Sequence, residues 1–197
     1  MDNFTRGLQY VPLTLQDTKL FIFVDGFFAN NRDLLSQIGY VVVLGNESTD
    51  IDSSSFTLTG NIVHWSSTKC KRITRSVLAS EIYGVANGVD IGFTIAATVS
   101  MILRQLSLPP VPLVVCTDSL SLYDYVMKLG ITREKRLMID IMALREMYER
   151  RELVDMRWIS GSSNPADAMT KALPNRALQQ LIDDNQLIVN VDGWVQR

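Results

Sequence analysis

The sequence has very few of the residues that build zinc sites and disulfide frameworks. It contains one histidine, His64, and two cysteines, Cys70 and Cys116, which lie far apart and form no CxxC pair. A structural zinc site takes four such ligands, so this class of site is close to excluded. A disulfide is not expected either, because no secretory signal precedes the two cysteines.

The chain also lacks an excess of positive charge and any evident membrane segment. Its Lys and Arg residues number 19 and its Asp and Glu residues 21, which gives a net charge of −2. Any surface for nucleic acid must therefore be local. Residues 1–19 do not have the basic-then-apolar order of a signal peptide, and no apolar run reaches transmembrane length. These absences predict an intracellular protein without a membrane partner.

The composition is that of a folded domain. The chain has 197 residues, of which 47% are hydrophobic and 20% charged, so it can bury a real core. We expect residues 1–18 to be a linker or the end of a preceding connection segment. Residues 19–186 are expected to form one domain, and residues 187–197 a C-terminal tail.

Apolar patterning predicts five strands and several helices. The strands are expected at residues 19–25, 38–45, 62–66, 113–118 and 154–160. Helices are expected at residues 76–106, 119–129, 134–152, from Pro165 onward, and at 174–185. Three strands with short connections, followed by alternating strands and helices, predict an α/β fold with a five-stranded mixed sheet flanked by helices.

Four acidic residues lie where predicted strands end or helices begin. Asp25 and Asp118 each end an apolar strand. Glu81 lies in the first turns of the long helix, and Asp167 in the opening turn of the helix that Pro165 begins. Alone, each acid also fits an ordinary role: a turn or cap for the two strand ends, a surface position for Glu81, and support of a helix start for Asp167.

Phosphodiester hydrolysis gives one reason for such acids to share a site. Carboxylate oxygens suit Mg²⁺, which needs only a few protein ligands. Two ions about 3.5–4 Å apart can activate water and stabilise a leaving oxygen. Without metal, carboxylates packed together repel one another. The joint placement therefore favours a metal site at Asp25, Glu81, Asp118 and Asp167.

Cations cluster next to this site. Residues 66–76 contain four cations and no acid: Lys69, Lys71, Arg72 and Arg75. Because this loop leads into the helix that carries Glu81, we expect it to contact phosphates, with a solvated basic loop as the alternative. Lys171, close to Asp167 in sequence, fits either a phosphate contact or a salt bridge.

Four sequence blocks then match a known pattern in order. They are FVDGFFANNRDLLSQIGYVVVLG, IVHWSSTKCKRITRSVLASEIYG, VVCTDSLSLYDYV and VDMRWISGSSNPADAMTKAL. Together they resemble the ribonuclease H domain of copia-type LTR retrotransposons, fungal members in particular. The resemblance covers roughly residues 19–173, and it implies a ribonuclease H-like fold.

The resemblance also implies an activity and a setting. The family's four catalytic, metal-binding acids fall on Asp25, Glu81, Asp118 and Asp167. It implies two Mg²⁺ ions, or Mn²⁺ in their place, and cleavage of the RNA strand of an RNA/DNA hybrid. The expected partner is the reverse transcriptase domain of the same polyprotein. The expected location is a cytoplasmic virus-like particle or the nucleus.

One departure from related enzymes keeps alternatives open. Cellular and retroviral ribonucleases H carry a histidine in the loop before the last Asp, whereas residues 161–165 (GSSNP) have none. One alternative is a catalytically weak or inactive module of the same fold that serves in nucleic-acid binding or assembly. A second is another nuclease of the superfamily, such as an integrase or a resolvase.

Overall fold

The computed structural model describes residues 7–49, 54–128, 130 and 134–193. Its strands are β1 (Lys19–Phe27), β2 (Gln37–Ser48), β3 (Ser55–Lys69), β4 (Leu113–Thr117), β5 (Asp155–Ile159) and β6 (Gln186–Gly193). Its α-helices are α1 (Val77–Gln105), α2 (Leu120–Met127), α3 (Lys135–Glu149), α4 (Asp167–Thr170) and α5 (Ala177–Asp184). Two 3₁₀ turns, η1 (Leu15–Asp17) and η2 (Gly161–Ser163), complete the order.

The strands form a mixed sheet in the order β1-β2-β3-β6-β5-β4, which closes where β4 returns to β1. The meander β1-β2-β3 is antiparallel, whereas β1 pairs with β4, and β4 with β5, in parallel. The antiparallel meander followed by parallel strands confirms the predicted mixed α/β sheet.

The predicted number of strands is wrong by one. Residues expected to begin the C-terminal tail form β6, which pairs antiparallel with β3 and β5. In β6 the buried side chains Leu187 and Val189 alternate with the exposed Gln186 and Ile188. This period of two indicates a strand, but the outer face also carries the apolar Ile188, which hid the pattern. The last predicted tail residues, 194–197, lie outside the described part.

The third strand is also longer than predicted, because it begins at Ser55 rather than at residue 62. Phe56 and Leu58 are buried while the neighbouring Ser55 and Thr57 are half-buried, so the first residues of β3 follow the alternation of a half-buried strand.

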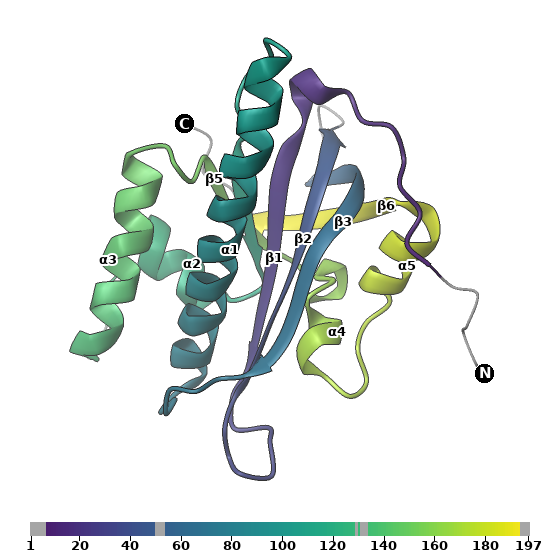
Figure 1. The fold of residues 1–197 in the computed structure, drawn as a ribbon. Coiled ribbons are helices and arrows are strands. Elements are labelled where there is room, and N and C mark those ends of the chain that lie inside the picture. Colours follow the sequence, from purple (N-terminus) through teal and green to yellow (C-terminus); the bar gives the residue numbers. More distant parts are fainter. Residues whose placement is uncertain (1–6, 50–53, 129, 131–133, 194–197) are drawn as a thin grey trace.

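Helix α1 crosses one face of the sheet, with α2 and α3 beside it, while α4 and α5 lie on the other side (Figure 1). Gly84, Gly88 and Gly92 turn toward β1; a Cβ at Gly92 would lie 2.2 Å from the Ile22 Cδ1 atom. These three glycines therefore allow α1 to pack closely on the sheet.

By length and apolar character alone, α1 could span a membrane. This corrects the expectation that no segment reaches that length. In this fold the first half of α1 packs against the sheet, whereas most residues of its second half are exposed or half-buried.

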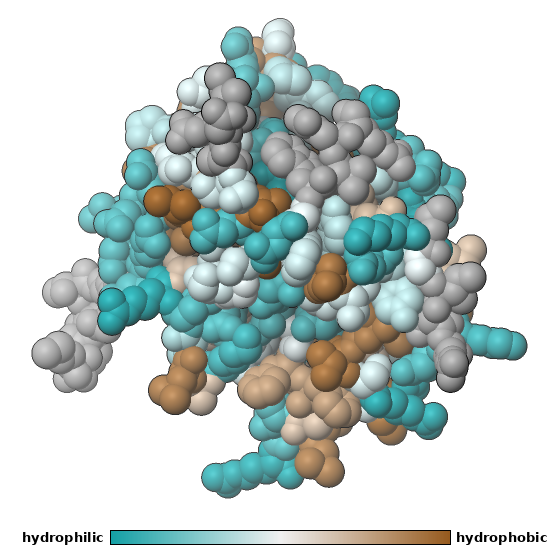
Figure 2. Space-filling view, turned by 180° about the vertical axis from the view of Figure 1, so that it is seen from behind, coloured by the Kyte–Doolittle hydropathy of each residue, from teal (hydrophilic) through white to brown (hydrophobic). Residues whose placement is uncertain are grey.

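Alternate residues of β1 pack into two different hydrophobic cores. Leu20, Ile22 and Val24 pack with α1, α2 and α3, whereas Phe21 and Phe23 pack with α5 and β6. Both cysteines are free and buried. Seen from behind, the surface is mainly hydrophilic, with hydrophobic residues in several separate groups (Figure 2). Strand β1 is covered on both faces by apolar side chains, so the buried carboxylate of Asp25 near its end is an exception.

Candidate metal centre

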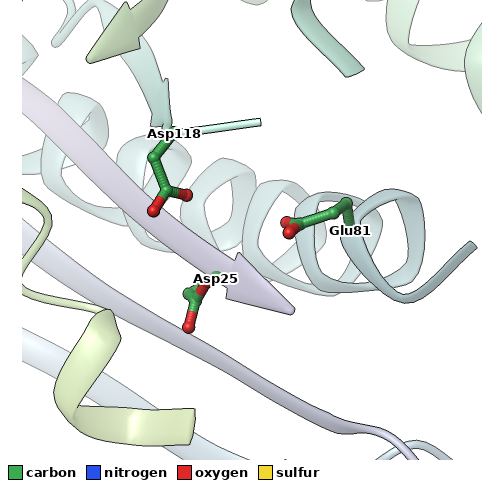
Figure 3. A group of neighbouring side chains, drawn as sticks. All are labelled: Asp25, Glu81 and Asp118. Atoms are coloured by element: carbon green, nitrogen blue, oxygen red, sulfur yellow. The ribbon is translucent and has the colours of Figure 1, made fainter. Parts of the chain in front are cut away.

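Asp25 and Asp118 are brought together by the parallel pairing of β1 with β4. The register places Val24 opposite Thr117, and each aspartate is the next residue along the chain, Asp25 within β1 and Asp118 directly after β4. Neighbouring strands lie about 4.8 Å apart, so the two side chains start from adjacent backbone positions. Figure 3 shows both carboxylates turned toward the same space.

Glu81 joins them because α1 begins very close to β1. Ser76 caps the helix by accepting a hydrogen bond from the Ala79 backbone N–H at 3.2 Å. A Cβ atom at Gly26 would lie only 2.7 Å from the Ser80 carbonyl and 2.8 Å from the Glu81 nitrogen. Only glycine therefore permits this approach of helix and strand. The approach puts Glu81 on the second helical turn, facing the two aspartates (Figure 3).

The three carboxylates form a compact group. One oxygen from each of Asp25, Glu81 and Asp118 lies within 4.8 Å of the other two. Asp25 is 3% and Glu81 7% exposed. The Glu81 Oε2 atom is buried, and no donor within the described residues reaches it. An unpaired buried carboxylate oxygen is costly, and a bound cation would satisfy it. The donor set, oxygen only, suits Mg²⁺ or Mn²⁺.

The electrostatics of the group favour a cation. Burial raises the pKa of Asp25 and of Asp118, and it raises the pKa of Glu81 well above its usual value. The neighbouring carboxylates raise the pKa of Glu81 further. The Lys171 ammonium acts in the opposite direction on all three pKa values. A divalent ion would stabilise the charged forms that burial disfavours.

Asp167 lies beside this group rather than in it. It is buried at the start of α4, and its charge raises the pKa of Asp25 and of Asp118. Both of its oxygens are engaged: Oδ1 pairs with the Lys171 ammonium, and Oδ2 accepts a hydrogen bond from the Asn175 backbone N–H at 2.7 Å. The structure thus brings three of the four predicted acids into one group, with the fourth adjacent.

Three neutral residues support the acids, and none of them was predicted from the sequence. The Thr170 hydroxyl donates to Asp25 Oδ2. The Asn164 amide donates to the Val24 carbonyl at 2.9 Å, and a hydrogen bond from it lowers the pKa of Asp118. The Asn175 side-chain amide donates a hydrogen bond to the Asn164 carbonyl oxygen at 3.0 Å. For Asn164 the sequence does contain a signal, because an Asn directly before a Pro at the start of a helix is typical of a capping residue.

The predicted phosphate-binding cations lie at the entry to α1. Lys69 pairs with Asp33 at 2.8 Å, and Arg72 pairs with Asp140 at 3.4 Å and lies over the Tyr83 ring. Lys71 and Arg75 are exposed. Three of the four line a hollow of about 540 Å³ between the sheet and α1: Lys69, Lys71 and Arg72. Lys171 forms the salt bridge that was one of its two expected roles.

The loop without histidine lies directly against the acids. A Cβ at Gly161 would be 3.2 Å from the Asp118 Oδ2 atom, so this part of the loop approaches Asp118 closely. His64 lies instead on β3, with its ring centroid 5.8 Å from that of Tyr40. It is therefore a half-buried strand residue that packs beside Tyr40.

Comparison with protein-family models gives no match, and comparison with curated proteins gives no significant match. Solved structures do match. Ribonuclease H1 from the halophilic archaeon Halobacterium salinarum aligns with a TM-score of 0.50 at 17% identity, over 82% of this chain and 98% of that one. LC11 ribonuclease H1, isolated from compost by a metagenomic approach, aligns with a TM-score of 0.52 at 19% identity, over 81% and 98%.

A structure of LC11 ribonuclease H1 in complex with an RNA/DNA hybrid also aligns, with a TM-score of 0.52 at 18% identity, over 81% of this chain and 99% of that one. At identities this low, the matches are evidence for a similar arrangement of the backbone and for nothing more. That arrangement agrees with the meander, the parallel strands and the flanking helices described above. The chain therefore has a ribonuclease H-like fold.

Proposed function

We propose that this protein is a metal-dependent ribonuclease H that hydrolyses the RNA strand of RNA/DNA hybrids. The observation that carries the proposal is the group of Asp25, Glu81 and Asp118, in which a buried glutamate oxygen has no protein partner among the described residues. Such a group is unfavourable for stability alone, and it suits a divalent cation.

The three carboxylates would hold the first ion, and Asp167 would complete the site for a second. When bound, Mg²⁺ or Mn²⁺ ions supply an activated water and neutralise charge on the phosphate. The protein's own part is to hold the ligands. Thr170 fixes one oxygen of Asp25, and the Asn175 backbone fixes one oxygen of Asp167. Preorganised ligands of this kind lower the cost of assembling the site.

The basic loop supports a nucleic-acid substrate. Lys69, Lys71 and Arg72 line a hollow beside the helix that carries Glu81, where phosphates of a duplex would meet them. Because the net charge is −2, attraction of phosphates depends on local clusters of cations such as this one. LC11 ribonuclease H1, which shares the fold, has been crystallised with an RNA/DNA hybrid, which is consistent with this substrate class.

The biological setting follows from the sequence resemblance. In a copia-type retrotransposon polyprotein the domain would follow the reverse transcriptase and degrade the RNA template after copying. Its place would then be a virus-like particle in the cytoplasm, or the nucleus.

The test is cleavage of a labelled RNA/DNA hybrid with Mg²⁺ or Mn²⁺, beside double-stranded RNA and double-stranded DNA. We expect cutting of the RNA strand of the hybrid only. Asp118→Asn should remove cutting while the circular dichroism spectrum stays unchanged. Glu152→Gln, at an exposed position shortly after α3, is the matched control and should cut normally.

Two outcomes contradict the proposal in different ways. Normal cutting by Asp118→Asn would remove that residue from the metal centre. A folded protein that binds hybrid but cuts nothing with either metal would favour the weak or inactive binding module.

The loop is tested by the salt dependence of binding. Replacing Lys69, Lys71 and Arg72 with Ala should weaken hybrid binding and reduce the slope of log K against log salt by about one unit for each phosphate that the loop neutralises. An unchanged slope would mean that the loop does not touch phosphate.

A further inference from the structure

Lys171 places a positive charge on one side of the metal centre. It directly follows α4, and its ammonium pairs with Asp167 Oδ1 and lies 3.9 Å from Asp25 Oδ2. The side chain is 36% exposed, so the ammonium can leave toward solvent. Two acids that the proposed function assigns to metal ions are therefore bridged by a cation that belongs to the protein.

The other side of the centre has no such charge among the described residues. The Glu81 Oε2 atom, buried and facing Asp25 and Asp118, has no partner there, whereas both oxygens of Asp167 have one. The acids on the two sides of the centre thus differ: Asp167 is paired with protein groups, whereas one oxygen of Glu81 is not. A first cation would meet unsatisfied oxygens, and a second would meet an ammonium.

We propose that Lys171 competes with a second divalent ion for Asp25 and Asp167, so that the first ion binds at Asp25, Glu81 and Asp118 and the second binds only as Lys171 is displaced. The proposal rests on the proposed function, since it concerns the same metal centre. It assigns Lys171 a positioning role that sets the order and the affinity of metal binding.

The physical basis is repulsion between like charges and the flexibility of lysine. An ammonium a few ångströms from a divalent ion repels it, and the repulsion is strong where burial lowers the effective dielectric constant. Lysine carries its charge on a flexible four-carbon stem, so displacement needs rotation of the side chain and no movement of the backbone. The neighbouring Thr170 hydroxyl would keep Asp25 in place during the exchange.

The experiment is calorimetric titration of the full chain with Mn²⁺, without substrate. We compare wild type, Lys171→Met, which removes the charge, and Lys171→Arg, which keeps it. Lys128→Met is the matched control, because Lys128 also pairs with an aspartate four residues earlier but is exposed. Lys171→Met should tighten binding of the second ion by about tenfold or more. The Arg variant and the Lys128 control should stay within about twofold of wild type.

A second measurement uses wild type alone, in case Lys171→Met does not fold. In protein labelled with ¹⁵N-lysine, the Lys171 ammonium signal should change with the second equivalent of Mg²⁺ rather than with the first. A signal that stays constant throughout would contradict displacement of Lys171.

The results separate the two proposals. If wild type binds Mn²⁺ and Asp118→Asn does not, the metal centre stands; an equal or weaker second affinity in Lys171→Met then overturns only the role of Lys171. If neither wild type nor Lys171→Met binds Mn²⁺ in a way that Asp118→Asn removes, the metal centre fails, and the role of Lys171 fails with it.

Discussion

The protein buries charge in two places, and the two places differ in how the charge is balanced. In the interior of the sheet, the Arg157 guanidinium donates to Glu47 at 2.6 Å and to Asp155 at 2.8 Å and lies over the Phe56 ring, while Lys19 pairs with the same Glu47. Two cations there face two acids. At the metal centre, the four acids share the ammonium of Lys171.

The pKa values of Glu47 and Glu81, one glutamate from each place, show this difference. Burial alone would raise the pKa of Glu47, but the hydrogen bonds from Arg157 and Lys19 outweigh it and lower that pKa. The pKa of Glu81 is raised by burial and then by its acidic neighbours. The cluster around Arg157 is balanced, with as many cations as acids, and it can stabilise the fold without a ligand. The cluster around Glu81 is unbalanced, because its acids outnumber its one cation, and a bound metal ion would neutralise the excess negative charge.

The largest effect is expected from breaking the balanced cluster. Arg157→Met keeps the bulk of the side chain but leaves Glu47 and Asp155 largely buried without their guanidinium. The free energy of unfolding should fall by about 3–5 kcal/mol in urea denaturation. Arg150→Met, which removes an exposed pair with Glu146, should change it by less than about 0.5 kcal/mol. Equal losses in the two variants would mean that Arg157 is not an internal counter-ion.

A smaller effect, of opposite sign, is expected at the unbalanced cluster. Glu81→Gln removes a buried charge without changing shape, so the metal-free protein should become more stable by roughly 1–3 kcal/mol while cleavage is lost. The measurement is thermal unfolding in EDTA, where each kcal/mol corresponds to roughly 2–4 °C. Saturating Mg²⁺ should stabilise wild type and leave the variant unchanged. A lower melting temperature for metal-free Glu81→Gln would show that the glutamate stabilises the fold.

The smallest effect concerns pH. Because folding raises the pKa values of Asp25, Glu81 and Asp118 above the ordinary 3.8 to 4.5, the folded protein binds more protons than the unfolded chain above those values. The stability contributed by these groups is present at low pH and is lost as pH rises through the raised folded pKa values. The gain from Glu81→Gln in EDTA should therefore grow from about pH 4 to about pH 7. A gain independent of pH would contradict the raised pKa of Glu81.

Most of the fold could be predicted because its strands are apolar runs and its helices have clear periodicity. The apolar runs at residues 19–25 and 113–118 correspond to β1 and β4, and the long periodic stretch at residues 76–106 corresponds to α1. Strand β6 was missed because its outward face mixes polar and apolar side chains. The start of β3 was missed because its outward Ser and Thr residues resemble those of a polar loop. Trp65 on β3 is 54% exposed, since aromatic character does not determine which face of a strand a residue occupies.

The acids could be predicted, but their partners could not. A strand that ends in an acid has a sequence signal, and the register of β1 with β4 then brings Asp25 and Asp118 together. The engagement of Asp167 by Lys171 and Asn175 depends on how residues after α4 fold back, which no local pattern specifies. The balanced cluster of Arg157 was missed for the same reason, because its members come from three separate strands.

The close approach of Gly26 to the start of α1 has a consequence for judging other chains of this kind. Any side chain at that position, even a methyl group, must push the helix away from the strand, because backbone atoms lie 2.7 Å from where it would sit. Glu81 would move with the helix, and the three ligand oxygens would separate. A chain of the same fold could thus keep every acid and still fail to bring the three carboxylates together. A search for chains that keep this group of carboxylates should therefore examine position 26 as well as the acids.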